Sequence, residues 1–189
     1  MRKTTKYAVF STNWGYCGIA GTRQGLVRTH LPAPDAGQVS ARLLESLGRA
    51  EADKDFLTGV QELIAAYFEG DRVDFTDGVP VQLEHLSGLT LSVLTACRLV
   101  EFGRTTTYGK LAESLGRPNA ARAVGNALAA NPLPLIIPCH RVIRSDGEMG
   151  GFSAPGGTVL KGRLLLHEQS RPEQPEAARD ESGHPTRGR

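Results

Sequence analysis

The sequence predicts an α/β protein of the α+β type, in which a small N-terminal β-sheet with a helix precedes a winged helix-turn-helix-like domain. Three observations predict this arrangement. Three short β-favouring runs fill the first 31 residues, and helical periodicity follows from residue 56. Two short helices, expected within residues 107–130, are joined by a tight turn that contains Gly116. The composition, with 40% hydrophobic and 22% charged residues in a chain of 189, is that of an ordinary globular protein.

The N-terminal region begins with strands and continues with a helix. The β-favouring runs cover residues 7–12, 16–22 and 26–31, and the short Gly-containing segments between them have the composition of hairpin turns. A helix is expected next, because five apolar residues recur at helical spacing before Gly70 ends the pattern. Those five residues are Phe56, Val60, Leu63, Ile64 and Tyr67.

The polar stretch from residue 71 to residue 86 lacks a long periodic segment and is expected to be a linker. It sets the predicted boundaries: an N-terminal α/β domain over residues 1–85, a second domain over 86–168 and a disordered tail over 169–189. The net charge is −2 in the first domain, +4 in the second and 0 in the tail. A basic excess confined to the second domain is compatible with a polyanionic partner, and also with an ordinary solvated surface.

The second domain has the pattern of a helix-turn-helix. A helix begins at Leu89, and the next one is expected to be capped by Thr106 or Thr107. Asn119 is expected to cap the last helix of the motif, which Pro132 prevents from continuing beyond residue 131.

On this last helix Arg122 points away from the apolar face formed by Val124 and Leu128. A single arginine on a helix of small residues can approach another backbone closely, which suits contact with DNA. A solvated surface arginine is the alternative.

The chain after Pro132 predicts an extended segment, a hairpin and a final helix. Two further prolines in residues 133–143 exclude a helix there. Residues 141–144 are expected to begin a hairpin, the wing of the motif, because residues 145–148 have the composition of a tight turn. The final helix is expected over residues 161–168.

Composition excludes several classes of protein. The longest apolar runs are a few residues, whereas a membrane-spanning helix needs about 20, so no membrane partner is expected. The basic N-terminus is not followed by a long apolar segment, so no secretory signal is expected. Cys17, Cys97 and Cys139 are an odd number without repeated spacing, which predicts neither a disulfide framework nor a metal site. Free thiols of this kind are typical of the cytoplasm, and no cofactor is expected.

Cys139 is the candidate nucleophile. A free cysteine is most often an inert buried residue. Here His140 and Arg141 adjoin it, and a nearby base or positive charge favours the reactive thiolate. Successive side chains of an extended segment point to opposite faces, so a water molecule between the cysteine and the histidine is a reasonable expectation. A carboxylate could orient the imidazole, and the candidates are Glu113, Glu148 and Glu168.

The sequence around Cys139 resembles the active-site signature of the O6-alkylguanine-DNA alkyltransferases, also called methylated-DNA–protein-cysteine methyltransferases. The resemblance covers residues 89–168, and the N-terminal region resembles the variable domain of that family only loosely. The matching motifs follow one another in the family's order. They are Thr107-Tyr108-Gly109, Arg117-Pro118, Ala121-Arg122-Ala123-Val124-Gly125, Asn131-Pro132, Pro138-Cys139-His140-Arg141-Val142, Gly150-Gly151-Phe152-Ser153 and the stretch 161–168.

The resemblance implies a DNA repair protein that acts once, because the transferred alkyl group stays on its cysteine. A guanine alkylated at O6 would be flipped out of duplex DNA, and Cys139 would attack the alkyl carbon. The family pattern makes His140 the water-mediated base and Glu168 the group that holds it. Asn131 would brace the active-site turn, and Tyr108 would help to protonate or stabilise the departing guanine.

The resemblance also implies how the base would be bound. The backbone N–H of Ser153 would donate to O6, and the carbonyls of Cys139 and Val142 would accept from the guanine amino group. Leu128 would line the pocket wall. The expected partner is double-stranded DNA containing O6-alkylguanine, and the protein is expected to be a monomer.

For DNA contact, Arg122 matches the residue that fills the gap left by the flipped base. The helix would enter the minor groove, where small residues such as Ala121 and Gly125 permit close approach. The chain departs from the family pattern where Phe152 replaces a frequent tyrosine. Its pocket loop is also lengthened by Ala154 and Pro155.

Two other functions compete with this interpretation. One is a non-catalytic protein that binds alkylated DNA, and such relatives lack the cysteine that is present here as Cys139. The other is a cysteine hydrolase that uses Cys139 and His140, although the sequence contains no recognisable oxyanion-hole motif.

Overall fold

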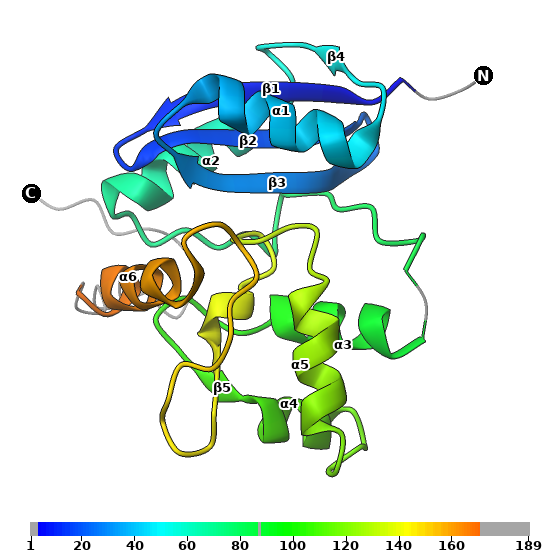
Figure 1. Ribbon diagram of the computed structural model, residues 1–189, viewed down its shortest axis with the longest axis vertical. Helices are drawn as coiled ribbons and strands as arrows, with labels where there is room; N and C mark the ends of the chain where they lie inside the picture. Colours follow the sequence, from blue (N-terminus) through cyan, green and yellow to red (C-terminus); the bar gives the residue numbers. More distant parts are fainter. Residues whose placement is uncertain (1–3, 87, 171–189) are drawn as a thin grey trace, which may run out of the picture.

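A four-stranded sheet organises the N-terminal half of the protein, as the computed structural model in Figure 1 shows. The structure describes residues 4–86 and 88–170. The strand order is β3-β2-β1-β4, with β1, β2 and β3 antiparallel and β4 parallel to β1. The bounds are Lys6–Thr12 for β1, Gly15–Thr22 for β2, Gly25–Ala33 for β3 and Glu51–Ala52 for β4. The three predicted strands and the predicted fold class are confirmed.

One helix covers each face of this sheet (Figure 1). Helix α1 (Ala36–Leu47) buries Leu43 in a cluster with Ala20 of β2. Helix α2 (Thr58–Glu69) packs on the other face, within the larger core that contains Ile19. Because successive side chains of a strand point to opposite faces, the neighbours Ile19 and Ala20 serve the two different clusters.

Helix α1 is not among the elements that the sequence analysis predicts, whereas α2 confirms the predicted helix. Asp35 caps α1 by accepting a hydrogen bond of 2.8 Å at Oδ1 from the N–H of Gln38. This cap, together with Val39 and Leu43 at helical spacing, is the signal that indicates the helix. Gly70 ends α2 with a φ of 100°, a left-handed conformation that glycine adopts at low cost.

The predicted linker over residues 71–86 is wrong, because this stretch is packed against the rest of the protein. The N–H of Leu26 donates to the carbonyl of Pro80 (2.9 Å), and the N–H of Gln82 donates to the carbonyl of Leu26 (2.8 Å). The guanidinium of Arg98 donates to three carbonyl groups of the same stretch. The apolar residues of the stretch 71–86 follow neither a helical nor a strand period, yet four of them are buried in the hydrophobic core that extends into the second half. They are Val73, Phe75, Val79 and Leu83.

The second half contains the predicted pair of short helices. The Oγ1 of Thr107 accepts from the N–H of Lys110 (3.1 Å) and caps the first of them, as expected. Asn119 does not cap the second, because Ala120 precedes that helix and offers no side-chain cap. The helices are α3 (Gly88–Arg98), α4 (Tyr108–Ser114), α5 (Ala121–Ala129), a one-turn 3-10 helix (Cys139–Arg141) and α6 (Gly157–Gln169); the strands are β5 (Thr106–Thr107) and β6 (Val142–Ile143).

The expected hairpin after residue 141 is replaced by a different pairing. Strand β6 pairs in parallel with β5, so that Thr106 lies opposite Val142. The expected tight turn is present, and the N–H of Arg144 donates to the carbonyl of Glu148 (2.8 Å). The chain beyond this turn forms no strand among the described residues, so β6 takes its partner from the segment before α4.

Helix α6 is longer than predicted, since it begins at Gly157 and ends at Gln169. The predicted disordered tail over residues 169–189 lies, from residue 171 onward, outside the described residues. In the part of the chain that the structure covers, no helix combines the length and the apolar character needed to cross a bilayer.

Candidate active site around Cys139

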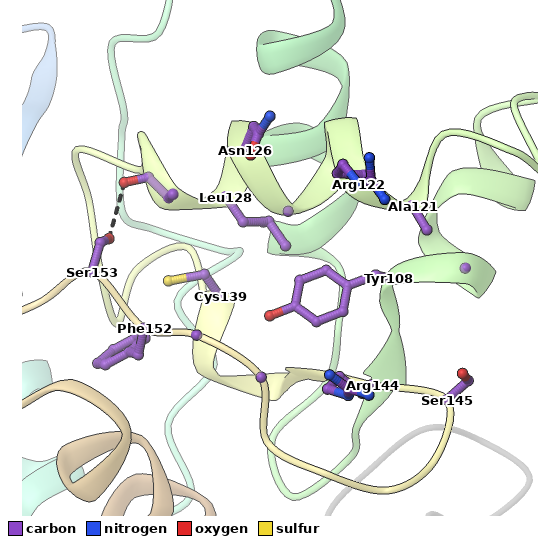
Figure 2. A pocket seen from close by; sticks show the side chains of 15 residues that line it. Tyr108, Ala121, Arg122, Asn126, Leu128, Cys139, Arg144, Ser145, Phe152 and Ser153 are labelled. Atoms are coloured by element: carbon purple, nitrogen blue, oxygen red, sulfur yellow. Dashed lines mark hydrogen bonds between the residues drawn. The ribbon is translucent and has the colours of Figure 1, made fainter.

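Cys139 lies in the one-turn 3-10 helix between α5 and β6, at the edge of a pocket of about 740 Å³. Its side chain is buried, with 8% of the residue exposed, so the sulfur is reached through this pocket. Figure 2 shows Cys139 among Tyr108, Leu128, Phe152 and Ser153, which line the same pocket. The size is that of pockets which bind small molecules or single bases.

Asn131 holds the segment that carries the cysteine. Its Nδ2 donates to the carbonyl of Ile137 (2.9 Å) and to the Sγ of Cys139 (3.2 Å). Its Oδ1 accepts from the N–H of Leu133 (3.0 Å). One side chain therefore fixes both ends of the proline-containing segment and contacts the sulfur directly.

The protonation of the Cys139 thiol is set by opposing effects. Burial raises its pKa, because a thiolate is poorly solvated in the interior. The hydrogen bond from Asn131, the charge of Lys161 and the backbone N–H groups of Cys139 and His140 all lower it. Burial is the larger effect, so the resting group is a thiol and its reaction requires a base.

His140, the predicted base, follows Cys139 directly in the chain. Its Nε2 lies 2.8 Å from Oε1 of Glu168, and both side chains are buried. Because the carboxylate only accepts, Nε2 carries the proton and Nδ1 is left as an acceptor. Nδ1 is buried and has no hydrogen-bond partner in the described part of the chain. Burial lowers the pKa of His140, and the charges of Arg141 and Lys161 lower it further, although Glu168 opposes them. The imidazole is therefore neutral and can accept a proton.

Glu168 is held ionised by its donors. Burial acts to raise its pKa, but the hydrogen bonds from His140 and Arg141, together with the charge of Arg141, outweigh burial and bring the pKa to about 2. Arg141 donates through Nε (2.9 Å) and Nη2 (3.0 Å), and Gly103 donates its backbone N–H (3.1 Å). The hydroxyl of Tyr67 donates to Oε1 (2.8 Å). Of the three carboxylates considered as partners of His140, Glu168 is the one that contacts it, and Glu113 and Glu148 do not take part in this cluster.

Lys161 is a fully buried cation near the cysteine. Its Nζ donates to the carbonyl of Val142 (2.6 Å) and to that of Gly151 (3.4 Å), and it lies 5.8 Å from the ring centre of Tyr108. Burial lowers its pKa, while a charge on the Cys139 sulfur would raise it. A buried lysine held by carbonyl groups therefore supports the thiolate electrostatically.

Tyr108 begins α4 and faces Cys139 across the pocket (Figure 2). Burial raises the pKa of its hydroxyl, so the group remains a proton donor. The loop at Gly150 passes close to it: a Cβ there would lie 2.9 Å from the Tyr108 hydroxyl, and the φ of Gly150 is +67°. Only glycine fits this loop against the tyrosine without displacing it.

The residues predicted to contact DNA lie along α5 at the mouth of the pocket. Ala121, Arg122, Gly125 and Leu128 all line it, and Arg122 is exposed whereas Leu128 is buried. The helix therefore presents a charged side chain and small residues at the opening, with its apolar face turned to the core.

The groups expected to read a base have part of their hydrogen-bonding capacity in use within the protein. The Oγ of Ser153 donates to the carbonyl of Ala129 (2.9 Å), which leaves the backbone N–H of Ser153 as the group available to a ligand. The carbonyl of Cys139 accepts from the N–H of Val142, and the carbonyl of Val142 accepts from Lys161. A carbonyl oxygen has two lone pairs, so each retains one for another donor.

The sequence analysis gives two contributors to this site no role in it and gives a third a different role. Tyr67 is predicted as a core residue of its helix, and Lys161 as part of the last helix. Arg141 is predicted to favour the thiolate directly, but the structure turns it to Glu168 and to the carbonyl of Val100 (2.6 Å). A lysine or arginine in an apolar pattern is the signal that could have indicated a buried charge cluster.

No group of three or more histidine, cysteine or acidic side chains that could hold a metal ion occurs within residues 4–86 and 88–170. Cys17, Cys97 and Cys139 are free and buried. Burial raises the pKa of Cys17 to about 12 and that of Cys97 well above its usual range, so neither is a reactive thiol.

Two family models match almost the whole described chain. Residues 89–170 match the DNA binding domain of 6-O-methylguanine DNA methyltransferase, and residues 5–83 match the ribonuclease-like domain of the same proteins.

Individual relatives agree with these models. The chain is 37% identical over 174 residues to the methylated-DNA–protein-cysteine methyltransferase of Mus musculus, a match that covers 86% of this chain and 81% of the mouse protein. The crystal structure of the O6-methylguanine methyltransferase of Mycobacterium tuberculosis superposes with a TM-score of 0.73 at 28% identity, covering 90% of this chain and 96% of the other. A structure of the Mycobacterium tuberculosis protein in complex with DNA gives a TM-score of 0.72 at 29% identity and covers 87% and 93% of the two chains.

The resemblance noted in the sequence is thereby confirmed, and its match extends into the N-terminal half. This chain belongs to the 6-O-methylguanine DNA methyltransferase family, whose members include the methylated-DNA–protein-cysteine methyltransferases.

Proposed function

We propose that this protein repairs DNA by moving an alkyl group from O6 of guanine to its own Cys139, once per molecule. The observation that carries the proposal is the sulfur of Cys139 at the edge of a 740 Å³ pocket, in contact with Asn131 and next in sequence to the buried His140–Glu168 pair. This arrangement supplies a nucleophile, a base and room for one flipped nucleobase.

The reaction begins with proton transfer from the thiol. Cys139 and His140 make no direct hydrogen bond in the described structure, and Nδ1 of His140 is the unused acceptor, so we infer transfer through a bridging water molecule. Glu168 stays ionised and stabilises the imidazolium that results. Lys161 and Asn131 stabilise the thiolate.

The thiolate then attacks the alkyl carbon in line with the C–O6 bond. A sulfur–carbon bond forms, the carbon–oxygen bond breaks, and its electron pair remains on the guanine. Tyr108 donates a proton to the departing base, and the N–H of Ser153 stabilises O6. The product on Cys139 is a thioether, which no residue of the site can cleave, so the protein is consumed.

Duplex DNA is the inferred substrate because the target atom is inaccessible for in-line attack inside the base stack. Arg122 fills the space left by the flipped base, and Ala121 and Gly125 let α5 approach the minor groove closely. The excess positive charge of residues 86–168 contributes contacts to phosphate that do not depend on sequence. We further infer a monomer that acts in the cytoplasm, where its three free cysteines stay reduced.

The decisive experiment exposes the protein to duplex DNA that contains O6-methylguanine and measures the mass of each cysteine-containing peptide. We expect a permanent gain of one methyl group on the Cys139 peptide. The variant Cys139→Ser should gain none while it keeps its affinity for the duplex, and Cys17→Ala, a change at another buried cysteine, should still react. Unmodified wild-type protein that nevertheless binds the alkylated duplex would instead identify a non-catalytic lesion-binding protein.

A further inference from the structure

A second cavity, of about 570 Å³, lies on another side of Cys139. It is placed between the N-terminal half and the active-site segment. Edge strand β3 is tied to that segment by Thr29, whose N–H donates to the carbonyl of Pro132 (3.1 Å) and whose Oγ1 donates to the carbonyl of Pro134 (2.7 Å). The two cavities share four lining residues, which are Ala129, Cys139, Phe152 and Ser153.

Cys139 therefore lines two spaces at once. Figure 2 shows the hydrogen bond between Ser153 and the carbonyl of Ala129, which joins two residues of the shared wall next to the sulfur. The first space is open to α5, where DNA would enter. The second is lined by β3 and α1 and has no obvious part in holding the base itself.

The second cavity is positively charged. Arg28 and Arg42 line it, and no aspartate or glutamate is among its lining residues. His30 also lines it, but the ring is neutral: its Nδ1 donates to the carbonyl of Leu31 (2.7 Å), and burial together with the charge of Arg42 lowers its pKa. The charge is thus supplied by the two guanidinium groups.

Arg28 has unused hydrogen-bonding capacity at this position. Its Nε is buried and has no acceptor among the described residues. Buried donors in folded proteins almost always have a partner, and Arg28 is a lining residue of this cavity, so its unpaired donor needs an explanation. Among the described residues, the side chain of Arg42 has only an exposed, weak pair with Glu45 (3.3 Å) and is available to a stronger acceptor.

We propose that this cavity is a subsite for an anionic group on the O6 substituent, in particular the carboxylate of an O6-carboxymethyl group. This inference rests on the proposed function, because it places the reacting carbon at the sulfur of Cys139. In an in-line attack the sulfur, carbon and oxygen are collinear, so anything else attached to that carbon must project sideways. The base fills the first cavity, and the second cavity adjoins the same sulfur.

The positive charge of the subsite offsets a repulsion between the substrate carboxylate and the attacking thiolate. A carboxylate one bond from the reacting carbon lies within a few ångströms of the attacking thiolate, and the two negative charges repel each other strongly where water is scarce. A guanidinium binds a carboxylate through two parallel hydrogen bonds and cancels its charge. Arg28 and Arg42 line the cavity that Cys139 also lines, and in this proposal they supply that guanidinium contact.

The step balances as it does for a methyl group. The proton of the thiol passes to His140, the sulfur bonds to the CH₂ carbon, and the bond from that carbon to O6 breaks. The electron pair leaves with the guanine, which takes up a proton. Cys139 ends as a thioether that carries an intact carboxymethyl group.

The test compares two lesions of nearly the same shape in the same duplex, O6-carboxymethylguanine and its neutral amide, O6-carbamoylmethylguanine. Single-turnover transfer rates are measured with the full-length protein and expressed as the ratio of the acid to the amide. We expect the wild-type ratio to exceed one. Arg28→Gln should lower it by about tenfold, the effect of one charge-assisted hydrogen bond, and Arg42→Gln by about threefold. Arg23→Gln, an exposed arginine in the turn before β3, serves as the control and should leave the ratio unchanged.

A wild-type ratio of one or less, or a ratio unaltered in both Arg28→Gln and Arg42→Gln, would overturn the subsite. A wild-type protein that accepts no methyl group from O6-methylguanine DNA would overturn the proposed function instead, so the two failures are distinguishable. The reacting fraction of each variant reports its folding. If Arg28→Gln does not fold, Arg28→Lys replaces it in the test, together with Arg42→Gln. Lysine keeps the charge but loses the paired hydrogen bonds, so Arg28→Lys should lower the ratio.

Discussion

The hydroxyl of Tyr67 donates a hydrogen bond of 2.8 Å to Oε1 of Glu168, 101 residues further along the chain. Tyr67 belongs to helix α2 of the N-terminal half, whereas Glu168 lies in α6 and holds the imidazole of His140. The contact is fully buried. The N-terminal half therefore completes the hydrogen bonds of the carboxylate on which the proposed base depends.

Replacing Tyr67 by phenylalanine tests this connection. Glu168 would lose one buried donor, which should lower the free energy of unfolding by about 1–2 kcal/mol. The carboxylate would then interact more strongly with His140 and raise the pKa of the imidazole. The acid limb of the transfer-rate profile against pH should move to higher pH, and urea denaturation gives the stability. Tyr7→Phe, which removes a hydroxyl bonded to Ser40 in the N-terminal sheet, should leave the profile in place. If the acid limb of Tyr67→Phe lies at the same pH as that of the wild type, the tyrosine contributes packing and does not affect the pKa of His140.

Asn131 should tune the reactivity of the thiol. The hydrogen bond from its Nδ2 lowers the pKa of Cys139, so Asn131→Ala should raise that pKa and reduce the thiolate fraction at neutral pH. A rise of one pKa unit lowers that fraction about tenfold. The measurement is the rate at which a small alkylating reagent modifies Cys139 as a function of pH. Asn13→Ala, an exposed asparagine in the turn before β2, is the control. Equal alkylation rates in Asn131→Ala and wild type would contradict the role given to this side chain.

Stability should fall in acid because of the His140–Glu168 pair. The pKa of Glu168 is depressed from 4.5 to about 2, which corresponds to about 3 kcal/mol of stabilisation at neutral pH. A depressed carboxylate pKa means that the unfolded state takes up the proton first, so this contribution is present above pH 4.5 and is lost as the pH falls toward 2. His140 acts in the same direction, because its pKa is lowered by burial and the unfolded state is protonated first below pH 6.5.

Urea denaturation between pH 7 and pH 3 measures this loss. In Glu168→Gln the decline of stability with acid should be shallower than in wild type. Glu113, whose carboxylate is exposed, provides the control. In Glu113→Gln the free energy of unfolding should decline with falling pH as steeply as in the wild type. Parallel curves for Glu168→Gln and wild type would show that the pair does not couple folding to pH.

Arg122 should matter only when a base has to leave a stack. Extrusion of a base costs a few kcal/mol, and a side chain that fills the gap offsets part of this cost. Arg122→Ala should therefore slow transfer from duplex DNA by about tenfold or more, and change the reaction with free O6-methylguanine by less than about twofold. Both rates are obtained by quenched single-turnover assays, with Arg23→Ala as the control. If Arg122→Ala slowed the reactions with duplex DNA and with the free base equally, Arg122 would not act by filling the gap left by the extruded base.

Much of this protein is predicted by local patterns. Alternation and hairpin residues predict β1, β2 and β3, and helical spacing predicts α2, α3 and the two helices of the helix-turn-helix. The proline-bounded segment around Cys139, with His140 beside it, is sufficient to propose Cys139 as the nucleophile and His140 as its base. Local patterns fail for α1, whose short apolar face is easily overlooked, and for residues 71–86, whose buried side chains follow no period.

The sequence by itself determined most of the elements, the candidate nucleophile and the family, because these depend on residues that are neighbours along the chain. Local patterns left three carboxylates open as partners of His140, and the family resemblance pointed to Glu168. Those patterns gave Tyr67 and Lys161 no part in the site and assigned Arg141 to the thiolate. The tertiary structure brought Glu168 to His140, turned Arg141 to the same carboxylate and gathered Tyr67 and Lys161 around the cysteine and its neighbouring histidine. The physical reason is that a buried charge is tolerated only where donors from distant segments converge on it, and that convergence is a property of the packed chain.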